Sequence, residues 1–197
     1  GWQEQIAFGD GWSYGVEFFV QKKVGAFSGW AGYTLSWTNR QFEELNFGEA
    51  FPYRYDRRHD LSLVATYQIN DRVDVAATWV YGTGNAVSLP LEQYVAPSAG
   101  EFDFFPTGID YYEGRNGYRM AAYHRMDVGI NFTKERKRWK RVWSLGAYNA
   151  YSRRNPFFLY FEEEYSEDVD GNIQVERSLN QVSLFPIVPY VTYSFKF

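Results

Sequence analysis

Strict alternation of apolar and polar residues is the feature that most constrains this chain of 197 residues. Residues 125–132 read RMDVGINF, so that every second residue is apolar. An alternation of period two places all the apolar side chains on one face of an extended strand. Helical periodicity is weak throughout, and the pattern predicts an all-β protein. The alternating stretches are seven, at 12–22, 26–38, 59–69, 72–81, 125–132, 142–151 and 183–197.

The connections between these stretches alternate strictly between short and long. Short turns are expected at about 22–25, 69–72 and 134–141, and long loops at about 40–58, 84–120 and 152–182. In an outer-membrane barrel, one rim carries short periplasmic turns and the other carries long extracellular loops. We therefore predict seven antiparallel strands of a transmembrane β-barrel. Alternation alone leaves a soluble β-sandwich or another soluble all-β binding module open.

Composition excludes several other classes of protein. There is no run of eighteen apolar residues, so no membrane-spanning helix is expected. A net charge of −4 argues against nucleic-acid binding, and the lack of cysteine excludes disulfides and thiolate chemistry. Aromatic residues make up 21% of the chain, and several lie near strand ends, as in the interfacial girdle of a membrane barrel.

Seven strands do not close a bacterial barrel, because single-chain barrels have an even number of strands. An open sheet would leave two unpaired edges in hydrocarbon, where unsatisfied backbone groups are not tolerated. We therefore expect residues 1–197 to be the C-terminal section of a longer barrel.

The chain resembles the last strands of a TonB-dependent outer-membrane receptor, of the branch common in Bacteroidota. The resemblance is carried by YGVEFFVQKKVGAFSGWAGYTLSWTNRQF, by FPYRYDRRHDLSLVATYQINDRVDVAATWVYGTGNAVSLP, by YHRMDVGINFT and GAYNAYSRRNPF, and by the terminal PYVTYSFKF. It implies a 22-stranded barrel in the bacterial outer membrane that binds a nutrient at the cell surface and imports it to the periplasm. A plug domain, absent from this chain, would contact the TonB–ExbB–ExbD complex. The other implied partners are outer-membrane lipid, the barrel assembly machinery and a surface lipoprotein.

Three groups of candidate site residues follow from this interpretation. Aromatic anchors in the loop 84–120 are candidates for substrate contact, since such side chains commonly line ligand sites: Tyr94, Phe102, Phe104, Phe105, Tyr111 and Tyr112. The polar face would line the lumen or contact the plug through Glu17, Thr66, Asp74, Arg125, Asp127 and Asn131. The final strand resembles the signal read by the assembly machinery, carried by Tyr193, Phe195 and Phe197.

Other charged motifs have ordinary explanations. The basic run KERKRWKR is expected to be a solvated periplasmic turn, with its cations near lipid headgroups. Asp168 and Asp170 are candidate oxygen ligands for Ca²⁺, but the EF-hand spacing is incomplete, so we predict no metal site. No cofactor is expected, and no catalytic motif is present, so we predict that the chain is not an enzyme. A porin or adhesin barrel without a plug remains the alternative function.

Overall fold

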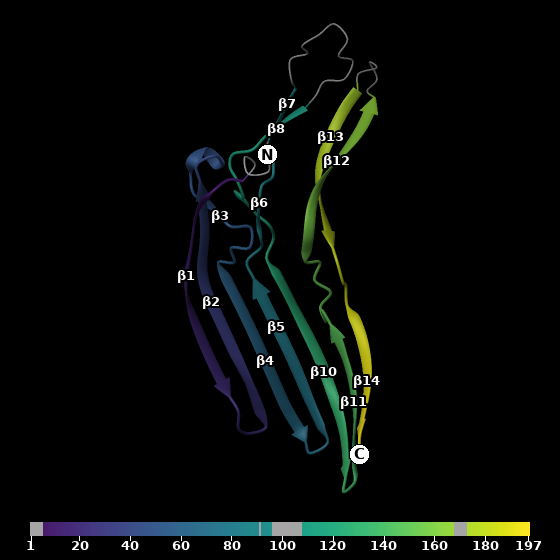
Figure 1. Cartoon of the computed structure of the whole chain (residues 1–197). Coiled ribbons are helices and arrows are strands. Elements are labelled where there is room, and N and C mark those ends of the chain that lie inside the picture. Colours follow the sequence, from purple (N-terminus) through teal and green to yellow (C-terminus); the bar gives the residue numbers. More distant parts are fainter. Residues whose placement is uncertain (1–5, 91, 96–107, 168–172) are drawn as a thin grey trace. The chain divides into compact units, whose positions relative to one another are not determined.

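The computed structural model describes residues 6–90, 92–95, 108–167 and 173–197 (Figure 1). The described residues form an all-β structure without α-helices, and a search of them for a helix long and apolar enough to cross a membrane found none. The elements are β1 (Gly9–Lys22), β2 (Phe27–Phe42), the 3-10 helix η2 (Asn46–Gly48), β3 (Phe51–Pro52), β4 (His59–Asn70), β5 (Val73–Gly82), β6 (Ala86–Val87), β7 (Glu92–Val95), β8 (Gly108–Tyr111), β9 (Tyr118–Arg119), β10 (Tyr123–Arg136), β11 (Trp139–Tyr148), β12 (Pro156–Glu167), β13 (Ile173–Ser183) and β14 (Val188–Lys196).

The main sheet has the strand order β1-β2-β4-β5-β10-β11-β14, with β3 added to β2. These seven strands correspond to the seven alternating stretches of the sequence, and their order in the sheet follows their order in the chain. Three smaller sheets form within the long connections: β6 with β9, β7 with β8, and β12 with β13. The prediction of an all-β antiparallel protein is thus confirmed.

Two of the three short connections are tighter than the sequence indicated. The turn expected over 134–141 has only two residues outside strands, because β10 continues to Arg136 and β11 begins at Trp139. The strands continue because Lys134 pairs with Arg141 and Arg136 with Trp139 in an unbroken antiparallel register. Between β4 and β5, the side-chain oxygen of Asn70 accepts hydrogen bonds from the backbone amides of Arg72 and Val73, which closes a two-residue turn.

The long connections contain structure of their own. The loop expected at 152–182 is largely a hairpin, in which β12 pairs with β13 along eleven residues from Pro156 to Glu167. The last alternating stretch begins later than position 183, because Ser183 ends β13 and β14 starts at Val188. Alternation in β11 stops at Tyr148, because Asn149 has a left-handed backbone with φ of 52°.

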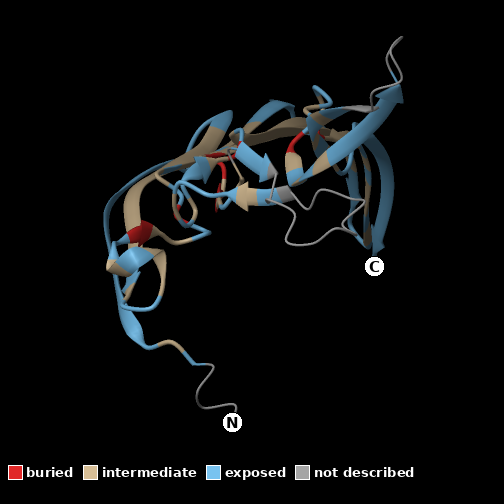
Figure 2. Ribbon diagram, turned by 90° about the horizontal axis from the view of Figure 1, so that it is seen from above, coloured by how far each residue is buried: buried red, intermediate tan, exposed pale blue. Residues whose placement is uncertain are grey.

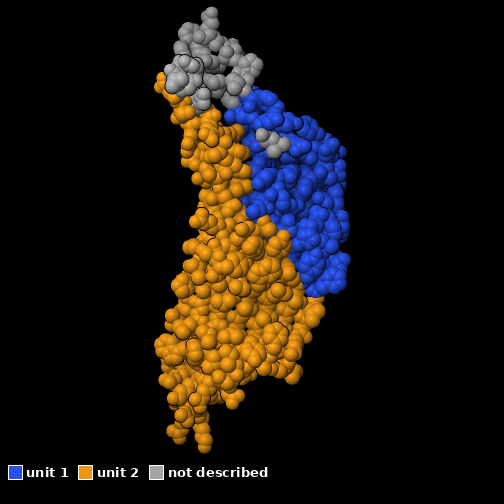
Figure 3. Space-filling view, turned by 180° about the vertical axis from the view of Figure 1, so that it is seen from behind, with its two compact units in different colours: residues 1–18, 33–60, 82–121 blue, residues 19–32, 61–81, 122–197 orange. Residues whose placement is uncertain are grey.

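The chain divides into two compact units, shown in Figure 3: residues 1–18, 33–60 and 82–121 form the first, and residues 19–32, 61–81 and 122–197 the second. Among the described residues, only three apolar side chains are buried (Phe51, Ala86 and Met120), and all three belong to the first unit. Figure 2 shows how few buried positions there are. Of these three residues, only Phe51 lies on a strand of the main sheet.

Candidate functional site

The polar face of the second unit brings several of the predicted lumen residues together. The side-chain amide of Asn131 on β10 donates a hydrogen bond of 2.7 Å to Asp74 on β5. Arg125 and Asp127 lie on the same face of β10 as Asn131, because they are separated from it by even numbers of residues. Thr66 lies on β4 of this unit.

Arg125 is the centre of the most connected cluster on this face, which we call the Arg125 cluster (Tyr123, Arg125, Asp127 and Tyr148). Its guanidinium donates to Asp127 Oδ2 through Nε at 3.1 Å and Nη2 at 2.9 Å, and Nη1 donates to the hydroxyls of Tyr123 and Tyr148. The guanidinium also lies 4.0 Å from the centre of the Tyr148 ring. Charged hydrogen bonds and ring stacking together hold the arginine in one orientation.

Asn149 connects this cluster to the two segments that flank the hairpin β12–β13. Its backbone amide donates to Asp127 Oδ1, while its side-chain amide donates to the carbonyls of Arg153 and Phe185. Its side-chain oxygen accepts a hydrogen bond from the amide of Arg153. The residue is 1% exposed and fully partnered. A cavity of about 280 Å³ lies beside it, lined partly by Arg125, Phe157 and Phe185.

A buried aspartate organises the connections of the first unit. Asp56 is 1% exposed, and it accepts hydrogen bonds from the Thr38 amide at 2.7 Å and from Arg119 Nη2 at 2.6 Å. Arg58 adds an ion pair of 3.4 Å. Burial raises the pKa of Asp56, but hydrogen bonds from Arg119 and Thr38 and the charges of Arg119 and Arg58 outweigh it, so the pKa is lower than usual.

The structure describes three of the six residues predicted to contact substrate. Tyr94 and Tyr111 lie on β7 and β8, and their rings meet edge to face with centroids 6.1 Å apart. Tyr112 directly follows β8, and all three tyrosines are about half exposed. The Tyr94 hydroxyl donates to Glu92, which raises the pKa of Tyr94. Phe102, Phe104 and Phe105 lie outside the described residues.

The other predicted residues are placed as follows. Glu17 is exposed on β1, in the first unit. Tyr193 and Phe195 lie on β14, and Phe197 follows it. Asp168 and Asp170 lie outside the described residues, and within the described part of the chain no three His, Cys, Asp or Glu side chains gather as a metal site would require.

Both histidines lie in aromatic clusters at strand ends. His59 Nδ1 is 2.8 Å from the Tyr33 hydroxyl, and His124 Nδ1 is 2.8 Å from the Tyr151 hydroxyl. The indole of Trp79 donates to the same Tyr151 hydroxyl. These rings continue the apolar side of the strands, since His59 and His124 share the parity of the apolar residues that follow them.

Sequence reasoning missed the two buried polar centres. Arg119 is separated from Asp56 by 63 positions, and no local sequence pattern connects them. The hydrogen bonds of Asn149 to Asp127 and Phe185 likewise join residues 22 and 36 positions apart. The polar groups described here are suited to hydrogen bonding and ionic contact with a polar ligand or a second protein surface.

Comparisons with family models, with curated proteins and with solved structures found no match to this chain.

Proposed function

We propose that residues 1–197 form the C-terminal seven strands of a transmembrane β-barrel in the bacterial outer membrane, the wall of a TonB-dependent active transporter. The observation that carries the membrane assignment is an extended apolar face that stays exposed. On β11 and β14, Trp143, Leu145, Val191, Tyr193 and Phe195 are between 40% and 66% exposed. A soluble sheet would cover such residues with a second layer, whereas a membrane barrel presents them to lipid.

The opposite face supports the same assignment. On that face, Asn131 donates a hydrogen bond to Asp74. Separately, the members of the Arg125 cluster are joined by hydrogen bonds such as that from Arg125 to Asp127. A barrel wall combines an apolar outer surface with a polar inner surface in this way. Strands of nine to sixteen residues are long enough to cross the hydrocarbon at a tilt of about 45°.

The edges of the sheet support a larger closed assembly. β1 and β14 end the strand order, and each has one edge without a partner among the described strands. Closing the barrel with additional strands would satisfy these edges. The transport function itself rests on the sequence resemblance. The ligand would be bound by the long connections and the plug.

The membrane assignment is tested by placing arginine on adjacent residues that face opposite ways. Leu145→Arg is expected to cost about 2–4 kcal/mol of unfolding free energy in phospholipid vesicles, because it inserts a charge into hydrocarbon. Ser144→Arg, one residue away on the polar face, is the matched control and is expected to change stability by less than about 1 kcal/mol. Equal costs at the two positions, or a protein that is folded and monodisperse without detergent, would contradict the assignment.

The transport function is tested with the full-length protein in cells. Dissipating the proton-motive force is expected to stop import while ligand binding at the surface continues. Import that persists under these conditions would instead identify a passive porin.

A further inference from the structure

The apolar face of the second unit ends in cations. On β10, Lys134 and Arg136 continue the alternation of Ile130 and Phe132, and so they lie on the same face. Arg141 of β11 pairs directly with Lys134, which places its side chain on that face too. We call Lys134, Arg136 and Arg141 the basic row. In the proposed barrel, cations at the end of an apolar face lie at the level of the lipid headgroups.

Within the described part of the chain, no carboxylate forms an ion pair with the basic row. Glu135 forms an ion pair of 3.4 Å with Lys140, and both have the parity of the polar face. The Arg141 guanidinium lies 5.6 Å from the centre of the Trp139 ring. Stacking on the indole leaves the edge of the guanidinium available for a bidentate anion such as a phosphate.

An aromatic layer follows the basic row along the strands. Trp143 pairs with Phe132 on one side and with Tyr193 on the other, and its ring centre lies 4.7 Å from that of Tyr193. Trp139, which pairs with Arg136, stacks against Phe195 with ring centroids 6.1 Å apart, so this second aromatic pair lies level with the basic row. Rings of this kind gather at the boundary between headgroups and hydrocarbon.

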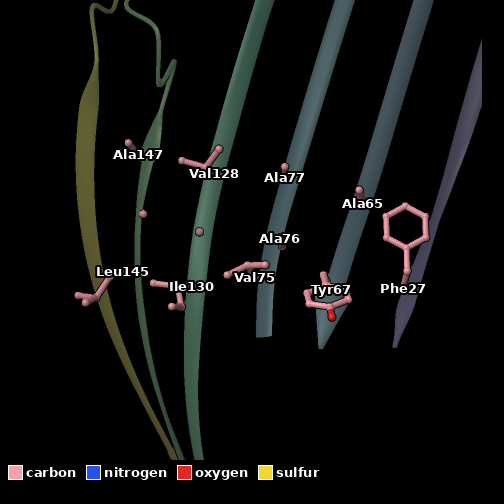
Figure 4. A pocket seen from close by; sticks show the side chains of 12 residues that line it. Phe27, Ala65, Tyr67, Val75, Ala76, Ala77, Val128, Ile130, Leu145 and Ala147 are labelled. Atoms are coloured by element: carbon pink, nitrogen blue, oxygen red, sulfur yellow. The ribbon is translucent and has the colours of Figure 1, made fainter. Parts of the chain in front are cut away.

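Beyond the aromatic layer the face is hollowed. A cavity of about 560 Å³ lies over β4, β5, β10 and β11, and its lining is almost entirely apolar. Figure 4 shows the lining: the short side chains of Ala65, Ala77 and Ala147 lie at about the level of Val128, above the larger Tyr67, Ile130 and Leu145. From Lys134 to Ile130 and Val128 is four to six residues, or about 13–20 Å at 3.3 Å per residue. One leaflet of hydrocarbon is about 15 Å deep, so an acyl chain that starts at the basic row would reach the hollow.

We propose that this surface is a binding site for one anionic phospholipid, whose phosphate contacts the basic row while an acyl chain crosses the aromatic layer and enters the hollow. The inference rests on the proposed membrane function, since it assigns a specific lipid to a face proposed to meet lipid. Charge complementarity selects the occupant: no ion pair of the described residues involves these three cations, and cations without a bound carboxylate favour a net negative headgroup over a zwitterionic one.

The test compares two triple variants of the full-length protein in uncharged detergent, with native mass spectrometry to count bound lipids. Phosphatidylglycerol is expected to bind the unaltered protein more tightly than phosphatidylcholine with the same acyl chains. Lys134→Gln/Arg136→Gln/Arg141→Gln should weaken phosphatidylglycerol binding by at least about tenfold. The matched control, Lys137→Gln/Arg138→Gln/Lys140→Gln, removes the same charge from the same hairpin but from the turn and the polar face, and should weaken it by less than about threefold.

A second variant tests the hollow independently of charge. Ala77→Leu/Ala147→Leu fills the apolar space. It should weaken the binding of both lipids to the same degree, by about threefold or more. Heat-dependent gel migration and circular dichroism establish that each variant is folded.

Three results would overturn the proposal: equal binding of the two lipids, equal loss in both charge triples, or a dimer in sedimentation that excludes lipid from this face. A failure of the proposed membrane function would give another result: the unaltered protein would be folded and monodisperse without detergent.

Discussion

Two glycines that face each other across β10 and β11 show how single residues shape the polar face. Gly129 pairs with Gly146, and the Tyr190 side chain from β14 lies over both. A Cβ on Gly146 would lie 2.5 Å from the Tyr190 hydroxyl oxygen and would also clash with the Val128 carbonyl. A Cβ on Gly129 would approach only that hydroxyl closely, at 2.7 Å, with the nearest backbone atom 3.6 Å away.

We therefore expect Gly146→Ala to cost about 2–3 kcal/mol of unfolding free energy, because backbone has to move. Gly129→Ala should cost less than about 1 kcal/mol, because a tyrosine can shift. Adding Tyr190→Phe should make Gly129→Ala neutral or stabilising by up to about 1 kcal/mol, since alanine also restricts the unfolded chain. Urea titration in lipid vesicles measures all three, and equal costs at the two glycines would contradict the packing.

The buried Asp56 permits a comparison with an exposed aspartate nearby. Asp56→Asn leaves Arg119 and Arg58 without their carboxylate and should lower the free energy of unfolding by about 2 kcal/mol. The loss stays at this size because both arginines are about one-third exposed and keep contact with water. Asp60→Asn breaks an ion pair with Arg57 in which both side chains are more than 40% exposed, and it should cost under about 1 kcal/mol. Urea denaturation of both variants measures the difference, and similar costs would argue against a structural role for Asp56.

The Asp56 carboxyl also predicts a pH dependence. Its pKa in the folded protein is lower than its ordinary value of 3.8, so its stabilisation is fully present above about pH 4. That contribution is lost as the pH falls below 3.8 and through the lower folded-state pKa. Unfolding free energies measured between pH 6 and pH 2 should therefore fall more steeply in this acid range for the unaltered protein than for Asp56→Asn. Parallel curves would contradict the assignment.

At the scale of elements, Asn149 holds the end of β11 against the segments that flank the hairpin β12–β13. Its side chain makes three hydrogen bonds, two with Arg153 and one with the Phe185 carbonyl. Its φ of 52° lies in the left-handed region that glycine adopts without strain.

Asn149→Gly consequently removes the hydrogen bonds and keeps the backbone, whereas Asn149→Ala adds strain of about 1 kcal/mol. We expect both variants to speed protease cleavage within residues 150–155, with alanine the faster of the two. Limited proteolysis followed by mass spectrometry measures the rates. If the unaltered protein and Asn149→Gly are cleaved at the same rate, the hydrogen bonds do not hold this segment.

The alternation of the sequence predicted the seven strands of the main sheet, but not where every strand ends. The C-terminal end of β10 and the N-terminal end of β11 were predicted as a turn, because they contain the charged residues Lys134, Arg136 and Arg141. In the structure these residues continue the pleat of the two strands. The strands β12 and β13 were not predicted, because the acidic run in β12 interrupts the alternation of apolar and polar residues.

At the scale of the whole molecule, the two edge strands set what the chain can form. One side of β1 and one side of β14 have no partner among the described strands. In an edge strand every second backbone amide points away from the sheet, so alternate amides stay open to exchange.

We expect alternate amides of β1 and β14 to exchange quickly with deuterium in the isolated 197-residue chain in detergent. Consecutive amides of β10 and β11, which have partners on both sides, should be protected. Residue-resolved hydrogen exchange distinguishes the two patterns, and closure into the proposed barrel should protect both edges. Uniform protection of β14 in an isolated monomer would show that its edge is already covered.

The sequence by itself determined the period of two, the number of main strands and which face of each strand is apolar, because these depend on residues adjacent in the chain. Only the tertiary structure decided that Asp56 meets Arg119, that Tyr190 covers Gly129 and Gly146, and that three cations share one face with an alanine-lined hollow. Such contacts depend on sheet order and register, which bring together side chains that lie far apart in the chain.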